Sequence, residues 1–164
     1  PDIVALAKPL AAGLPMGACL ASAALADTFD KGEHGSTFAG GPLVCRAALV
    51  FLDEIERGLL DNVLMRGQEL RAGLDGLAAK FPIVREVRGR GLMFGLRLWH
   101  SAAEFQKALY QDGVITNCTA GDVIRIVPPF VLTEADVTQG LRSMREVLAT
   151  FPQQKELATA GQKS

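Results

Sequence analysis

The sequence lacks the features that mark nucleic-acid-binding, membrane or disulfide-rich proteins. Its formal net charge is −1 over 164 residues, which provides no basic surface for nucleic acid or an anionic membrane. No apolar run approaches the roughly 20 residues that span a bilayer. Cysteine occurs only three times, at the widely separated Cys19, Cys45 and Cys118. We expect reduced core thiols in a cytoplasmic protein, and neither a disulfide framework nor a zinc site.

Histidine is also scarce, and the sequence does not begin with methionine. The two histidines, His34 and His100, have no partner at metal-ligand spacing, so no metal site is expected. The chain starts at Pro1, and we expect the natural N-terminus, with any organellar targeting signal, to lie upstream. The residues that are present include 49% hydrophobic and 21% charged side chains, as in ordinary globular proteins. The length allows one domain or pieces of two.

The hydrophobic pattern predicts two regions that differ in texture. In the first we expect buried strands at 2–7 and 17–21, a short helix at 22–29 capped by Ser22, a polar loop at 30–41, and helices at 43–57 and 60–80 separated near Gly58. In the second we expect strands at 83–88, 92–99, 114–118 and 123–127, and helices at 101–111 and 134–149, the last capped by Thr133. The polar end, 152–164, is predicted to be a disordered tail.

Lys8 is the first candidate for chemistry. It follows the apolar run 3–7 and precedes a turn-forming segment that contains Pro9, Gly13 and Pro15. A lysine amine attacks carbonyls only when it is neutral, and burial favours that form, as Schiff-base chemistry requires. The spacing alone favours an ordinary solvated lysine at the end of a strand. The other lysines are interpreted as surface charges: Lys31, Lys80, Lys107, Lys155 and Lys163.

The segment His34-Gly35-Ser36-Thr37 presents two hydroxyls in a glycine-containing loop shortly before a helix that starts near Pro42. Hydroxyl and backbone N–H donors suit a phosphate dianion. The same residues also suit an ordinary turn closed by serine or threonine. The pattern leaves both interpretations open.

Arginine clusters in the second region. Arg125 lies between apolar residues of the expected strand 123–127, where a charge needs a partner. A guanidinium recognises a carboxylate with two parallel hydrogen bonds, so this partner is either a ligand carboxylate or a structural acid. Four other arginines surround the glycines of VRGRGLMFG and are predicted to be mostly solvated: Arg85, Arg88, Arg90 and Arg97. That segment is no dinucleotide fingerprint, because its third glycine is misplaced and no helix follows.

Four segments in order resemble the class III (ornithine-type) aminotransferases, which use pyridoxal 5'-phosphate. They are LAKPLAAGLPMGA, HGSTFAGGPLVCRAAL, VREVRGRGLMFGLRL and GVITNCTAGDVIRIVPPFVLTEADV. Family members are well over twice this long, so the likeness is to their C-terminal part. The implied fold is α/β, of the aspartate-aminotransferase-like fold type I. Residues 1–80 would end the cofactor-binding large domain and form a connecting helix, and residues 81–151 would form a small α+β C-terminal domain.

The resemblance also implies a role for each candidate residue. Lys8 would form the internal Schiff base with pyridoxal phosphate and move the α-proton. Thr37, helped by Ser36, would bind the phosphate of the cofactor in the neighbouring subunit, which requires a homodimer. Arg125 would bind the substrate carboxylate. Gly41 stands where many members have asparagine, which weakens any side-chain role there.

Within the family the likeness is greatest to the acetylornithine aminotransferases. It implies transfer of an amino group from N-acetylornithine to 2-oxoglutarate in arginine biosynthesis. Ornithine, succinylornithine and 4-aminobutyrate aminotransferases remain alternatives, as does a non-catalytic remnant that serves only as a folding or dimerisation module. In the family the acid that pairs with the pyridine nitrogen lies upstream, so we expect residues 1–164 alone to bind the cofactor weakly and not to transaminate.

Overall fold

The chain has a mixed α/β fold that divides into two compact units. A computed structural model describes residues 1–153, and its contacts separate Pro1–Gly58 from Leu59–Ser164. The sequence analysis placed the boundary between the two parts after Lys80. The helix that ends there belongs with the second unit, because its buried Leu70, Leu74 and Leu77 form part of that unit's hydrophobic core.

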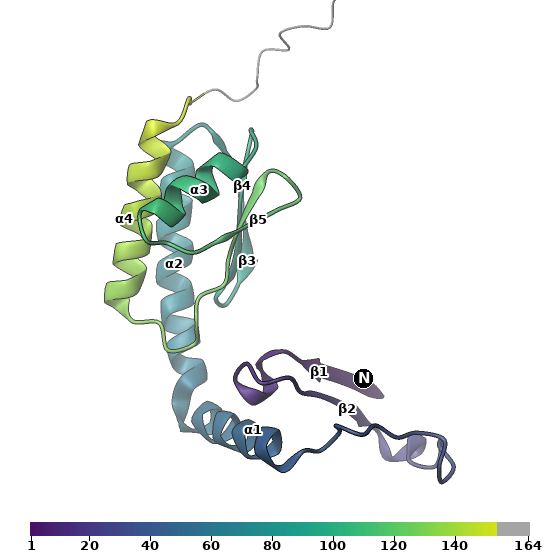
Figure 1. The fold of residues 1–164 in the computed structure, drawn as a ribbon. Coiled ribbons are helices and arrows are strands. Elements are labelled where there is room, and N and C mark those ends of the chain that lie inside the picture. The colour runs from purple at the N-terminus through teal and green to yellow at the C-terminus, as the bar shows by residue number, and fades with distance from the viewer. Residues whose placement is uncertain (154–164) are drawn as a thin grey trace, which may run out of the picture. The chain divides into compact units, whose positions relative to one another are not determined.

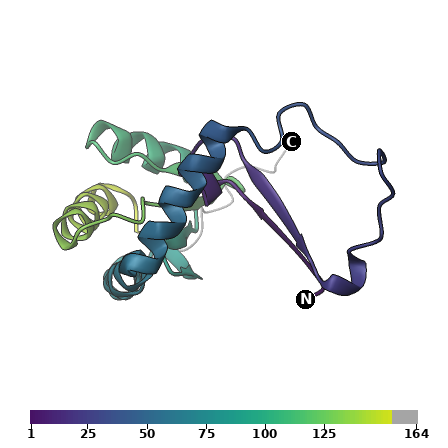
Figure 2. The same cartoon turned by 90° about the horizontal axis from the view of Figure 1, so that it is seen from below.

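The first unit consists of a β-hairpin, short 3-10 turns and one helix. Its elements are β1 (Ile3–Ala7), η1 (Pro9–Ala11), β2 (Gly17–Ala21), η2 (Ala23–Leu25) and α1 (Pro42–Glu54). Strands β1 and β2 pair antiparallel from Ile3 opposite Ala21 to Ala7 opposite Gly17. η1 packs against α1, and residues between η2 and α1 run in a wide arc (Figure 2). The two strands and the start of α1 at a proline confirm the sequence-based elements.

Burial of the hairpin was wrongly predicted. Ile3 is 59% exposed and Leu20 is 56% exposed, and the buried apolar residues of this unit are Ala11 and Ala48. A two-stranded sheet has two faces, and this unit packs no apolar layer over them. Cys19 lies on the exposed strand β2 and is therefore no core thiol, whereas Cys45 and Cys118 are half-buried. All three cysteines are free.

The expected helix at 22–29 was also wrong. Only one 3-10 turn forms, at Ala23–Leu25, and Ser22 is extended and makes no capping hydrogen bond through its side chain. Such a short segment is a marginal helix unless tertiary packing stabilises it, and most of its side chains are exposed. The break near Gly58 is confirmed: Gly58 has φ 104° within the irregular turn η3 (Ile55–Leu59) that precedes the next helix.

The second unit is a four-stranded antiparallel sheet with three helices. Its elements are α2 (Leu60–Lys80), β3 (Val84–Arg90), β4 (Met93–Leu98), α3 (Ala103–Gln111), β5 (Asn117–Thr119), β6 (Val123–Ile126) and α4 (Glu134–Thr150). The strand order is β3-β4-β6-β5. The helices lie on one side of the sheet (Figure 1) and share one core with Phe94, Leu96, Leu98, Ile124 and Ile126. Alternate residues on the strands therefore face the opposite, helix-free side.

The elements of the second unit match the sequence-based expectation closely. The strand expected at 114–118 is shorter and later, because only Asn117–Thr119 pairs with β6. Thr133 caps α4 as predicted: its hydroxyl accepts a hydrogen bond from the Asp136 N–H, and the Asp136 carboxylate accepts one from the Thr133 N–H. Beyond residue 153 the expected tail lies outside the described residues.

Candidate functional site

Lys8 lies at the turn that ends β1 and begins η1. Its backbone has φ 63° and ψ −73°, a region that L-residues rarely adopt and that costs on the order of 1–3 kcal/mol. Pro9 follows at the first position of η1, and the hairpin closes beside it where Ala7 pairs with Gly17. Within this chain Lys8 is exposed, so the burial expected for it is not observed. Its amine is open to an aldehyde from solvent.

Ser36 and Thr37 lie in the exposed segment before α1. The local fold there is a turn in which the Ala39 N–H donates to the Ser36 carbonyl at 3.3 Å. Within residues 1–153 neither hydroxyl makes a hydrogen bond, so both remain available to a ligand. The structure therefore gives these side chains no structural task in the first unit.

Arg125 lies on the helix-free face of the sheet, on strand β6. Its guanidinium donates a hydrogen bond of 3.3 Å to the side-chain oxygen of Asn117 on β5. Of the two partners considered from the sequence, a structural acid is not found among the described residues. Asn117 was missed by the sequence analysis, although strand alternation places it opposite Arg125 once β5 and β6 are paired correctly.

The arginines near VRGRGLMFG divide into two kinds. Arg88 and Arg90 are exposed, as predicted. Arg97 was wrongly expected to be solvated: it is half-buried and its Nε lies 2.7 Å from the Asp122 carboxylate. The hydrogen bond from Arg97 holds the pKa of Asp122 below its usual range. Arg85 stacks over the Trp99 ring at 4.6 Å.

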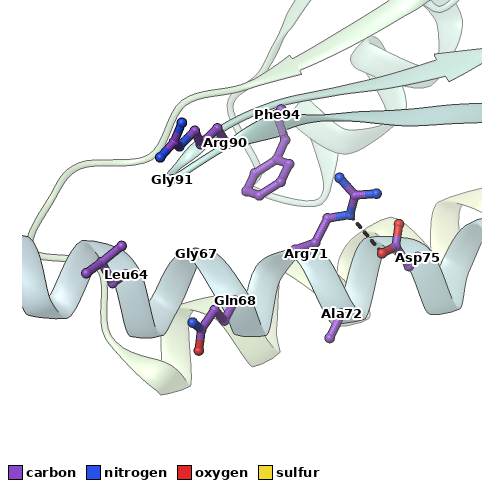
Figure 3. A pocket seen from close by; sticks show the side chains of 10 residues that line it. Leu64, Gly67, Gln68, Arg71, Ala72, Asp75, Arg90, Gly91 and Phe94 are labelled. Carbon is purple, nitrogen blue, oxygen red and sulfur yellow. Dashed lines mark hydrogen bonds and ion pairs between the residues drawn. The ribbon is translucent and has the colours of Figure 1, made fainter.

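Two cavities occur in the second unit, and none of the predicted site residues lines either. The first, of about 390 Å³, lies between α2 and the β3–β4 turn (Figure 3). Arg71 and Asp75 form an ion pair of 2.7 Å along its wall. The second, of about 560 Å³, is mostly apolar and is lined by residues that include Val114, Val127 and Met144. No group of three His, Cys, Asp or Glu in residues 1–153 is placed to hold a metal ion.

The chemistry of the candidate residues fits the three functional groups of a pyridoxal phosphate enzyme. A primary amine in its neutral form suits an aldehyde, two hydroxyls without a hydrogen-bond partner suit a phosphate, and an arginine without an acidic partner among residues 1–153 suits a carboxylate. Lys8, Ser36 and Thr37 belong to the first unit and Arg125 to the second.

In the described part of the chain, no helix is long and apolar enough to cross a membrane.

Comparison with known proteins identifies the family of this chain. The profile of class-III aminotransferases matches residues 1–148, so the chain belongs to the class-III aminotransferase family, a family of transferases. It is 40% identical over 148 residues to an acetylornithine aminotransferase of Aquifex aeolicus, covering 90% of this chain and 38% of that protein. The chain thus spans about two fifths of the length of this relative.

Solved structures give the same fold. An acetylornithine aminotransferase from Elizabethkingia anophelis superimposes with a TM-score of 0.86 at 30% identity, over 92% of this chain and 41% of that one. An ornithine aminotransferase from Toxoplasma gondii gives 0.85 at 30% identity, over 91% and 37%. The fold is therefore that of the corresponding part of a class-III aminotransferase, which confirms the fold class inferred from the sequence.

Proposed function

We propose that this chain is part of a pyridoxal-phosphate-dependent aminotransferase that acts on the ω-amino group of N-acetylornithine and uses 2-oxoglutarate as the amino acceptor. The proposal includes a homodimer that works in arginine biosynthesis in the cytoplasm. The observation that carries it is the position of Lys8, an exposed amine at a strained turn inside a segment that matches the family. The name of the Aquifex relative supports the choice of donor.

Each candidate residue has a distinct task in this proposal. The Lys8 amine holds the cofactor through its aldehyde, and when released it moves the proton of the carbon that bears the transferred nitrogen. Thr37, with Ser36, donates hydrogen bonds to the phosphate of the cofactor of a second copy. Arg125 orients a substrate through its carboxylate. When bound, pyridoxal phosphate supplies the electron-withdrawing ring that makes that proton acidic.

Ornithine is the second candidate donor. The structural similarity to the Toxoplasma ornithine aminotransferase, with a TM-score of 0.85, is nearly as high as the 0.86 of the Elizabethkingia acetylornithine aminotransferase. Free ornithine carries a second ammonium group where N-acetylornithine carries a neutral amide. A donor-competition assay with both compounds would separate the two, because a site built for the neutral amide leaves that ammonium without a partner.

The proposal is tested by trapping pyridoxal phosphate on the 164-residue chain with borohydride and mapping the labelled peptides. We expect the reduced phosphopyridoxyl group on Lys8 in excess over every other lysine. Lys8→Ala should lose this label. Lys31→Ala is the matched control, because Lys31 is an exposed lysine in a turn of the same unit, and it should keep the label on Lys8.

Equal labelling of all exposed lysines would contradict the role of Lys8 and favour a non-catalytic folding or dimerisation module. Turnover of N-acetylornithine is a separate measurement. We expect none from the 164-residue chain alone, because residues 1–153 contain no acid that we assign to the pyridine nitrogen. Transamination by this chain alone would contradict that part of the proposal.

A further inference from the structure

Four residues form one row across the helix-free face of the sheet. Arg88 of β3 is opposite Gly95 of β4, Gly95 is opposite Arg125 of β6, and Arg125 is opposite Asn117 of β5. Directly paired residues of neighbouring strands project to the same face. Two arginines therefore stand on the same side of the sheet with a single glycine between them.

Gly95 contributes no side chain to the helix-free face between these two arginines. Its φ is not positive, so the backbone does not demand glycine there. A Cβ at this position would lie 3.2 Å from Val123 Cγ1 and 3.5 Å from both Cγ and Nε of Arg88. The side chain of Arg88 therefore leans over Gly95, in the direction of Arg125. A methyl group at residue 95 would touch Arg88 at ordinary van der Waals distance and would press on Val123.

The acidic residues of this region do not neutralise the row. Glu86 is opposite Arg97 in the strand register, in the neighbouring row, and Asp122 already pairs with Arg97. Within residues 1–153 neither Arg88 nor Arg125 has an acidic partner. Two strand spacings separate their Cα atoms, about 10 Å, so both guanidinium groups can reach a ligand above Gly95. An anion there would relieve the repulsion between the like charges.

We propose that Arg88 and Arg125 together bind one carboxylate group above Gly95, with Asn117 holding the guanidinium of Arg125. Arg88 is thus a second substrate-binding residue for the carboxylate of the amino acid or 2-oxo acid. The inference rests on the carboxylate-binding role of Arg125 under the proposed function and adds a second residue to it. It predicts that carboxylate affinity depends on the charge of residue 88 and on the paired N–H donors of its guanidinium. The affinity should also depend on the small size of residue 95.

The test is a titration of the 164-residue chain with glutarate, followed by NMR through the arginine Nε–Hε signals. Glutaramide, which is uncharged and nearly isosteric, is the control ligand. We expect the signals of Arg88 and Arg125 to shift together with one dissociation constant, and no response to glutaramide. Arg88→Gln should weaken glutarate binding about five- to tenfold, and Arg88→Lys by less, since it keeps the charge and loses the fork.

Arg90→Gln is the matched control, because Arg90 is an exposed arginine at the end of the same strand. This substitution removes the same charge as Arg88→Gln. It should leave glutarate affinity within about twofold, because Arg90 is opposite Met93 and lies outside the row that contains Gly95 and Arg125. Gly95→Ala should weaken binding by less than Arg88→Gln does, because its methyl group would contact Arg88 at ordinary distance and would mainly displace Val123. Thermal unfolding of each variant shows whether its fold is retained, and binding is compared only among folded variants.

Two results would overturn the inference. One is a shift of Arg125 with no response from Arg88. The other is an equal loss for Arg88→Gln and Arg90→Gln, which would show a general charge effect. Neither depends on pyridoxal phosphate, so failure of the Lys8 trapping experiment and failure of this one are separate findings.

Discussion

The two units of this chain differ in how far they bury the apolar residues of their strands. In the second unit the apolar residues of β4 and β6 that face the helices are buried, with Leu96 and Ile124 at 0% exposure. In the first unit most apolar residues of β1 and β2 are exposed, with Leu20 at 56%, and none is buried. Both pairs of strands are antiparallel and regular. The difference lies in the helices that pack on one sheet and are lacking over the other.

This contrast separates a second unit that carries the hydrophobic core, and also holds Arg125, from a first unit that holds Lys8, Ser36 and Thr37 without such a core. The second unit has a continuous core that joins its sheet to α2, α3 and α4. The first unit holds Lys8, Ser36 and Thr37 on exposed turns and loops, and its apolar surface is uncovered. Exposed apolar patches of this kind mark surfaces that associate with another protein surface. We therefore expect unfolding of residues 1–153 to report on the second unit.

The largest expected effect comes from a comparison of one leucine truncation in each unit. Leu96→Ala should lower the free energy of unfolding by about 2–5 kcal/mol, because it removes a fully buried side chain and leaves a cavity. Leu20→Ala, the same change on an exposed strand, should alter it by less than about 0.5 kcal/mol. Urea unfolding followed by circular dichroism measures both. Similar losses for the two variants would show that the first unit is packed in solution.

A pair of glycines within α2 gives a smaller and more local test of the second unit. A Cβ at Gly67 would lie 2.5 Å from the Gly91 carbonyl oxygen, whereas a Cβ at Gly76 would meet nothing within 4 Å. Gly67→Ala should destabilise by about 1–3 kcal/mol, because the backbone of the β3–β4 turn must move. Gly76→Ala should stabilise by about 0.5–1 kcal/mol, since alanine favours the helix. The same urea experiment reads both.

The opposite signs make this pair informative. If Gly67→Ala were also stabilising, α2 would not pack closely on the turn at Gly91, and the wall of the cavity in Figure 3 would differ from that described. Gly76 therefore serves as the control for helix propensity, and the difference between the variants isolates the close approach of helix and turn.

The sequence predicted the second unit well because each local signal there agrees with the tertiary packing. Helix α2 ends at Lys80 as its periodicity indicated, and the capping residue Thr133 begins α4. In the first unit the apolar runs 3–7 and 17–21 indicated buried strands, and the burial was wrong. The apolar residues of a strand indicate that it is stabilised by burial, but they do not determine which other element packs over it.

The candidate site shows the same limit. Lys8, Thr37 and Arg125 were chosen from local spacing and family resemblance, both of which are visible in the sequence. Asn117 beside Arg125, and Gly95 beneath it, depend on how three strands align. Registers of that kind follow from pairing across the whole sheet. The positive φ of Lys8 likewise follows from the way the hairpin meets η1, which composition does not reveal.

The smallest expected effect concerns acid sensitivity, which should also differ between the units. Asp136 and Asp122, the groups with lowered pKa among residues 1–153, both belong to the second unit. For Asp136 the cause is hydrogen bonding from the side chain and backbone N–H of Thr133 to the carboxylate. A lowered folded pKa stabilises above the unfolded value, near pH 3.9, and this contribution is lost as the pH falls through the folded value.

Thr133→Ala removes the donor hydroxyl and the N-cap of α4. At neutral pH it should lower the free energy of unfolding by about 1 kcal/mol. The gap between wild type and variant should narrow as the pH falls through the lowered pKa of Asp136, because protonation of this carboxylate removes part of the same interaction in the wild type. Thr138→Ala, an exposed threonine later in α4, is the control and should show no such pH dependence. A gap that stays constant from neutral to acid pH would mean that the hydroxyl acts on the helix end alone, with no linkage to the Asp136 carboxylate.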